Sequence, residues 1–125
     1  MPIEKFSTDK APPPVGPYSQ VVKAGDLVIT AGQIPINPAN GELISEISEA
    51  TEQTIRNIQA VLEAAGASLD QVISMTVYMA DLGDFEAMNK VYETFFGAAK
   101  PVRAAMRAAA SRPQASRTIK RIPCS

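Results

Sequence analysis

The sequence of 125 residues contains no histidine, no tryptophan and one cysteine, Cys124. Histidine is the commonest general base and metal ligand, so its absence excludes Ser-His-Asp triads, Cys-His dyads and the familiar zinc sites. A single cysteine forms no internal disulfide and fits a reducing compartment, and nothing around Cys124 resembles a catalytic cysteine setting. Any chemistry must therefore rest on carboxylates, tyrosine, arginine, lysine, amides or backbone groups.

Other patterns are missing too. Neither GxGxxG nor GxxxxGK[ST] occurs, so no nucleotide cofactor is expected. No apolar run approaches the roughly 18 to 20 residues that cross a bilayer, and residues 1–14 lack the apolar stretch of a secretory signal. With 46% hydrophobic and 20% charged residues, we expect a single globular domain over residues 1–125 that is soluble and cytoplasmic and has no membrane partner.

Hydrophobic periodicity predicts strands first, and then helices and strands in alternation. Strands are expected over residues 20–23, 27–30, 33–36, 72–79 and 101–106, after an extended, proline-rich lead-in. In the strand 72–79 the residues expected on the buried face are Ile73, Met75, Val77 and Met79.

Two helices are expected between these strands. The first begins at a Ser48 cap and is ended by Gly66, and the second runs from an Asp84 cap to Phe96 and is ended by Gly97. The apolar stripe of the second helix consists of Phe85, Met88, Tyr92, Phe95 and Phe96. The order of elements indicates an α+β fold with helices on one face of a mixed sheet.

Three polar residues stand where packing alone does not require them. Asn89 borders the apolar stripe of the second helix, and is either a site residue or an amide bonded to a neighbouring loop. Arg103, at the start of the last predicted strand, is either a bidentate carboxylate ligand or a solvated arginine. Tyr18, in a Gly-Pro turn, is either a site residue or a packing residue with a hydrated hydroxyl.

Segments around these residues resemble motifs of the RidA/YjgF family, in the family's order and spacing. The resemblance covers residues 1 to about 106. Its motifs are GPYSQ at 16–20, AGQIP at 31–35, TIRNIQAVLEAAG at 54–66, TVYMADLGDF at 76–85, NKVYETFF at 89–96 and PVR at 101–103.

The resemblance implies a chorismate-mutase-like fold, a mixed β-sheet with two helices on one face, assembled as a homotrimer with ligand clefts between subunits. It also implies hydrolysis of 2-imino acids such as 2-iminobutanoate and 2-iminopropanoate, or their enamine tautomers, to 2-oxo acids and ammonia, without a cofactor. By motif, Arg103 binds the substrate carboxylate, Tyr18 and Asn89 orient the imine or the attacking water, and Gly32 and Gln33 line the same cleft.

The end of the chain departs from the family pattern. The family normally closes with a strand such as VEIEAIA, whose first glutamate positions the water, but an ungapped alignment from Arg103 places Thr118 and Lys120 at its two glutamates. Residues 107–117 show no apolar period and are interpreted as irregular. A reading-frame change near codon 104 is one hypothesis for this end.

A genuine basic tail is the competing hypothesis. Residues 1–99 hold all 13 acidic and 5 of the 12 basic residues, a net charge of −8, whereas residues 100–125 hold 7 basic residues and no acid, a net charge of +7. Three functions stay open: a working deaminase, a trimeric carboxylate-binding protein that has lost hydrolysis, and an interaction protein that uses the tail. Nucleic acid is a disfavoured partner because the tail lacks an aromatic residue for base stacking.

Overall fold

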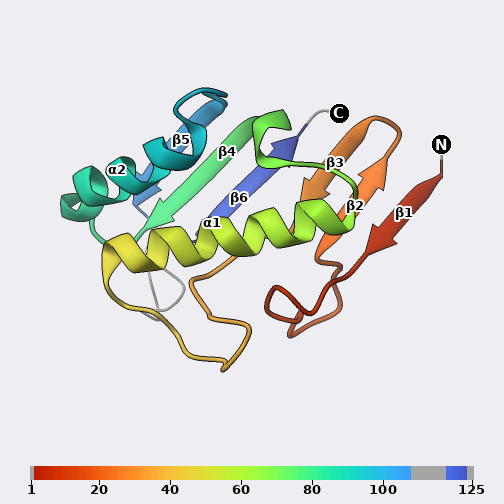
Figure 1. Cartoon of the computed structure of the whole chain (residues 1–125), viewed down its shortest axis with the longest axis horizontal. Coiled ribbons are helices and arrows are strands. Elements are labelled where there is room, and N and C mark those ends of the chain that lie inside the picture. Colours follow the sequence, from red (N-terminus) through yellow and green to blue (C-terminus); the bar gives the residue numbers. More distant parts are fainter. Residues whose placement is uncertain (1, 108–117, 124–125) are drawn as a thin grey trace.

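The computed structural model describes residues 2–107 and 118–123, and its strands form one layer (Figure 1). Strands β1 (Ile3–Phe6), β2 (Val21–Ala24) and β3 (Leu27–Thr30) form an antiparallel sheet. In a second sheet, β4 (Val72–Met79) pairs in parallel with β5 (Val102–Arg107) and antiparallel with β6 (Thr118–Pro123). Because β3 lies beside β6, the two sheets continue into each other.

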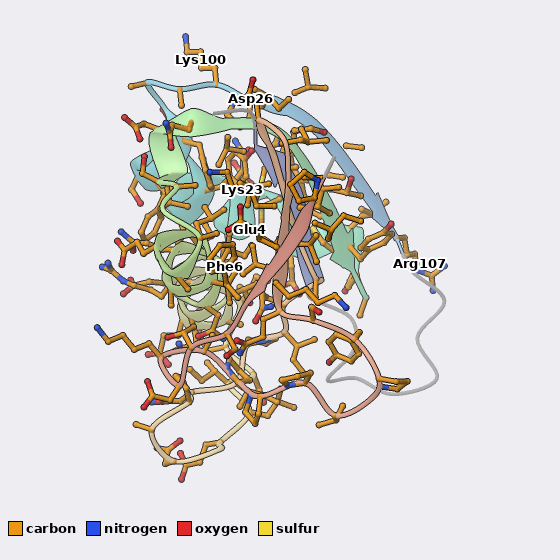
Figure 2. The ribbon with its side chains drawn as sticks, turned by 90° about the vertical axis from the view of Figure 1, so that its right-hand side faces the viewer. Glu4, Phe6, Lys23, Asp26, Lys100 and Arg107 are labelled. Carbon is orange, nitrogen blue, oxygen red and sulfur yellow. The ribbon has the colours of Figure 1, made fainter. Side chains whose placement is uncertain are left out.

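Both helices cover the same face of this layer. Helix α1 (Ile47–Ala64) crosses the strands, and α2 (Phe85–Phe96) lies next to it over β4 and β5. The single turns η1 (Leu69–Gln71) and η2 (Leu82–Asp84) precede β4 and α2. A view turned by 90° shows the strands on one side and the helices on the other (Figure 2). The expected α+β fold, a mixed sheet with two helices on one face, is confirmed.

The core lies between the helices and the strands. Its largest fully buried side chains come from both helices and the central strand of the second sheet: Ile55, Ile58 and Leu62 of α1, Met75 and Met79 of β4, and Met88 and Phe96 of α2. The predicted stripe of α2 is confirmed, with Phe85 and Phe95 packed half-buried at its borders. None of the described helices is both long and apolar enough to span a membrane.

Two predictions about strands were wrong. Ile73 is 45% exposed, whereas Val72 is 4% exposed, because the register of β4 against β6 shifts between Val72 and Ser74 and changes which residue faces the core. Residues 33–36 form no strand, and the pairing found there is an isolated bridge between Ile36 and Leu43. The sequence pattern also did not predict β1, which pairs with β2.

The ends of the helices follow the predictions in part. Gly66 adopts a left-handed φ of 80° and ends α1 as expected. The N-cap is Glu46 rather than Ser48, because the Glu46 carboxylate accepts a hydrogen bond from the backbone N–H of Glu49 at 2.7 Å. Gly97 ends α2 in a right-handed conformation, with a φ of −59°.

The basic end of the chain contributes two strands. Arg107 belongs to β5, so its assignment to an irregular segment was wrong. The backbone of β6 pairs with β4, with Thr118 opposite Tyr78 and Lys120 opposite Thr76. Residues 108–117, which were also interpreted as irregular, and Cys124 lie outside the described residues.

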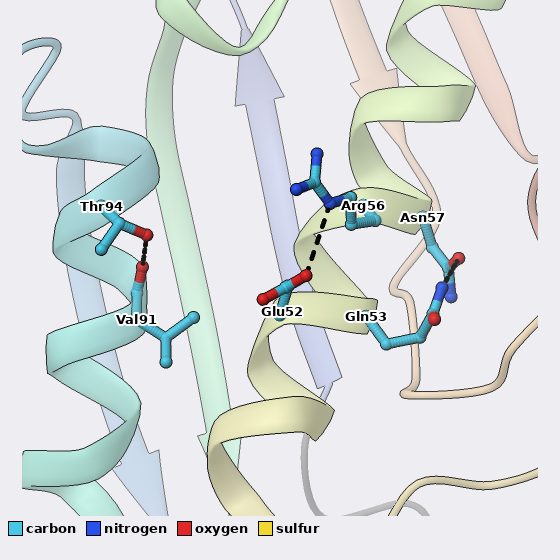
Figure 3. A network of polar contacts seen from close by, with 6 residues as sticks. All are labelled: Glu52, Gln53, Arg56, Asn57, Val91 and Thr94. Carbon is cyan, nitrogen blue, oxygen red and sulfur yellow. Dashed lines mark hydrogen bonds and ion pairs between the residues drawn. The ribbon is translucent and has the colours of Figure 1, made fainter.

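A fully buried amide on α1 holds the loop that was expected to be a strand. The Asn57 Nδ2 donates to the carbonyls of Ile34 and Ile36 at 3.2 and 2.9 Å, and its Oδ1 accepts from Gln53 Nε2 at 2.9 Å (Figure 3). These carbonyls therefore bond to a helix side chain instead of a neighbouring strand. The loop directly follows Gly32 and Gln33, so Asn57 also anchors this candidate site segment.

Replacing Asn57 with alanine is expected to lower the free energy of unfolding by about 2–3 kcal/mol, because a fully buried side chain is truncated and its three hydrogen bonds, to the part-buried Ile34 and Ile36 carbonyls and the Gln53 amide, are lost. Urea unfolding followed by circular dichroism measures the change. Gln59→Ala, on the same helix and half-buried, is the matched control and should change stability by less than about 1 kcal/mol. Equal effects of the two substitutions would contradict the anchoring role.

Candidate active site

Arg103 lies at the start of β5, on the side of the sheet that faces the helices. In the parallel register it stands beside Met75, which is buried under the helices. From this position its Nη1 donates to the Asn89 Oδ1 at 2.6 Å. The amide of Asn89 is thus the partner of the half-buried arginine, and the two predicted site residues come together across 14 positions of sequence.

Aromatic rings support the guanidinium of Arg103. Its Cζ lies 4.6 Å from the ring centroid of Tyr92 and 5.4 Å from that of Phe85. The Tyr92 ring is itself buried and stands 4.7 Å from the ring of Phe96. Cation–π contacts of this kind fix the plane of a guanidinium while leaving its edge to donate hydrogen bonds. The arginine is therefore held in place before a ligand arrives.

An open hollow lies next to this arginine, between the end of α2 and the start of β5. Beside the rings of Tyr92 and Phe96, its lining comprises Asn89 and Glu93 of α2, the helix C-cap Gly97, Lys100 and Pro101 of the connecting segment, and Arg103 of β5. Two cations and one carboxylate give it a positive balance. A small ligand with a carboxylate suits this lining, because a guanidinium grips a carboxylate through two parallel hydrogen bonds.

The remaining predicted site residues lie elsewhere in the chain. Tyr18 is 51% exposed, accepts a hydrogen bond from the Val15 N–H at 3.4 Å, and lines a second hollow together with Gly32. Gln33 is 5% exposed, and its Nε2 donates to the carbonyl of Ala31 at 3.5 Å. Within one chain the structure thus pairs Arg103 with Asn89, and Tyr18 with Gly32, but the two pairs line different hollows.

Several residues of the first hollow were not predicted as site residues from the sequence. Tyr92 and Phe85 were interpreted only as core residues, although both rings also contact Arg103. Glu93 and Lys100 were not singled out. A signal was available for the carboxylate, because Glu93 follows Asn89 by four residues and so lies on the same face of the helix.

Comparisons with known proteins agree with this architecture. Residues 8–122 match the family model described as Endoribonuclease L-PSP. A RutC family protein of Pyrococcus abyssi is 52% identical over 104 residues, which are 82% of each chain. The 2-iminobutanoate/2-iminopropanoate deaminase of Escherichia coli K12 is 41% identical over 91 residues, which are 73% of this chain and 71% of the relative.

Solved structures share the fold over almost the whole chain. The crystal structure of E. coli TdcF with bound serine has a TM-score of 0.91 and 34% identity, and covers 98% of both chains. That of the E. coli YjgF gene product has a TM-score of 0.90 and 34% identity, and covers 97% of this chain and 98% of the other. On the matched residues and these identities, the chain belongs to the Endoribonuclease L-PSP family, the family of the RidA and YjgF proteins.

Proposed function

We propose that this protein hydrolyses reactive 2-imino acids, with 2-iminobutanoate and 2-iminopropanoate as substrates, to 2-oxo acids and ammonia. The observation that carries the proposal is the Arg103 guanidinium, held by Asn89 and two aromatic rings at the edge of an open, positively charged hollow. The relative named as a deaminase of the same two imino acids adds support.

In this proposal Arg103 binds the substrate carboxylate and so fixes the imine carbon, which is bonded directly to the carboxylate carbon. A protonated imine is already electrophilic, so the protein mainly has to position the substrate and hold a water molecule near the carbon. Asn89 keeps Arg103 in its orientation through the 2.6 Å hydrogen bond. Tyr18 and Gly32, with Gln33 behind them, complete the cleft from a neighbouring subunit.

A homotrimer is part of the proposal, because a single chain leaves the two groups of site residues in different hollows. The helix-free face of the strands also exposes apolar side chains, with Ile29 40% and Val102 74% exposed. Burial of these side chains between subunits would remove them from water. Sedimentation equilibrium should give three times the mass of the chain.

A trimeric protein that binds small carboxylates without hydrolysing imines is the second candidate. It is favoured by Thr118, which stands where the family pattern has its water-positioning glutamate. The TdcF structure with bound serine indicates that this fold also binds an amino acid. For both candidate functions we propose that the protein acts in the cytoplasm, with which its single cysteine is consistent.

The test is the rate of 2-oxobutanoate formation when the protein is added to threonine dehydratase and threonine, with semicarbazide competing for the imine. Acceleration of 2-oxobutanoate formation is the result expected of a deaminase. Unaccelerated formation, combined with binding of 2-oxobutanoate in calorimetry, would replace the deaminase with the binding protein.

A further inference from the structure

Glu93 is the only carboxylate among the described residues that line the hollow beside Arg103. It lies one helical turn after Asn89, and side chains at this spacing are neighbours, with Cβ atoms about 5–6 Å apart. Asn89 in turn bonds directly to Arg103. The helix therefore brings a carboxylate to the lining of the hollow that also contains the guanidinium that would hold the substrate.

The position of Glu93 is not explained by the stability of the helix. It lies near the C-terminal end of α2, where the helix dipole disfavours a negative charge, and the last turn of α2 contains no basic residue. Glu93 is exposed and makes no ion pair with another described residue, although Lys100 lines the same hollow. Its carboxylate is therefore open to water and to a ligand.

The geometry points to Glu93 as the catalytic base of the proposed imine hydrolysis, an inference that rests on the proposed function. Among the charged groups of the hollow, the ammonium of Lys100 and the guanidinium of Arg103 only donate hydrogen bonds, whereas a carboxylate accepts them. Water that attacks an imine carbon must give up a proton. Glu93 is the group placed to accept it.

The reaction then proceeds in two steps, the addition of water and the loss of ammonia. The water oxygen bonds to the iminium carbon, the π-electron pair of the C=N bond moves to nitrogen, and one water proton passes to the Glu93 carboxylate. The resulting carbinolamine receives that proton on its nitrogen. The C–N bond breaks, ammonia leaves with the electron pair, and the hydroxyl loses its proton to solvent as the carbonyl of the 2-oxo acid forms.

The experiment compares Glu93→Gln with the wild-type chain in the coupled dehydratase assay. Glu93→Gln should lower kcat by at least roughly 100-fold, the usual contribution of a positioned general base, while the Kd for 2-oxobutanoate changes less than about threefold. Glu93→Ala should behave alike and regain activity when formate is added, because formate supplies the missing carboxylate. The matched control is Glu86→Gln, an exposed acid on the same helix outside the hollow, and it should retain wild-type kcat.

The outcomes separate this inference from the proposed function. If the wild-type chain is active and Glu93→Gln has a similar kcat, the proposed deaminase activity is supported and the role of Glu93 as base is overturned. An inactive wild-type chain that binds 2-oxobutanoate would overturn both. Binding of 2-oxobutanoate by Glu93→Gln shows that the variant is folded, so that its loss of kcat supports the inference.

Discussion

Replacing Arg103 with alanine should lower kcat/KM for 2-iminobutanoate by at least roughly 100-fold, which corresponds to about 3 kcal/mol of lost transition-state stabilisation. The variant removes the guanidinium that would grip the substrate carboxylate, together with the donor to Asn89. The Kd for 2-oxobutanoate should rise in parallel, because the product carries the same carboxylate. The coupled dehydratase assay and calorimetry measure the two effects.

Two further variants show which property of Arg103 matters. Arg103→Lys keeps the charge but loses the planar fork, so it should recover only part of the activity. Arg56→Ala is the matched control. The Arg56 Cζ also lies over a phenylalanine ring, 5.2 Å from the centroid of Phe95, but Arg56 is on the surface of α1 and outside the hollow beside Arg103. Wild-type kcat/KM in Arg103→Ala would refute the carboxylate-binding role.

Replacing Phe96 with alanine should lower the free energy of unfolding by about 3–5 kcal/mol, the usual cost of truncating a fully buried phenylalanine. Phe96 is 1% exposed and packs its ring against Tyr92, so its removal leaves a cavity beneath the ring that supports Arg103. The loss is a large part of the roughly 5–15 kcal/mol that stabilises an ordinary domain. Urea unfolding at one fixed protein concentration measures it, because assembly makes stability depend on concentration.

The neighbouring Phe95 provides the comparison for Phe96. It is half-buried and its ring faces Arg56, so Phe95→Ala should cost only about 1–2 kcal/mol. Similar losses for the two variants would mean that the end of α2 is less tightly packed than the burial of Phe96 indicates.

Those parts of the fold that depend on local periodicity could be predicted from the sequence. The stripe of α2 around Met88, Tyr92 and Phe96 repeats every three or four residues, and the burial of one face follows from that spacing alone. The left-handed turn at Gly66 is also a local property, because glycine adopts a positive φ without steric cost.

The predictions about the fold that were wrong or missing concern residues whose partners lie far away in sequence. Whether Val72 or Ile73 faces the core is decided by the pairing of β4 with β6, more than 40 residues later. Residues 33–36 have the composition of a strand, but the carbonyls of Ile34 and Ile36 accept hydrogen bonds from the Asn57 side chain, and the segment forms only an isolated bridge with Leu43. Strand β1 is stabilised by backbone pairing with β2 while Ile3 stays 64% exposed, so it carries no clear hydrophobic pattern.

The candidate site also has residues that could be predicted from the sequence and contacts that could not. Arg103 and Asn89 could be selected from sequence, because an arginine and an amide next to apolar segments suggest a ligand site. The contacts of Arg103 with Tyr92 and Phe85 could not, because they arise only when β5 returns beside β4 and under α2. Periodicity describes Tyr92 as a core residue, which is correct but omits the contact that its ring makes with Arg103.

The order of strands in the second sheet has a consequence for how the chain folds during synthesis. Strand β4 lies between β5 and β6, and β6 is formed by Thr118–Pro123 near the end of the sequence. The β1–β2–β3 meander and the β4–α2–β5 unit involve near neighbours in sequence and can form while the ribosome is still elongating the chain. One edge of β4 stays unpaired until β6 has been synthesised, and during that interval it is open to pairing with another nascent chain.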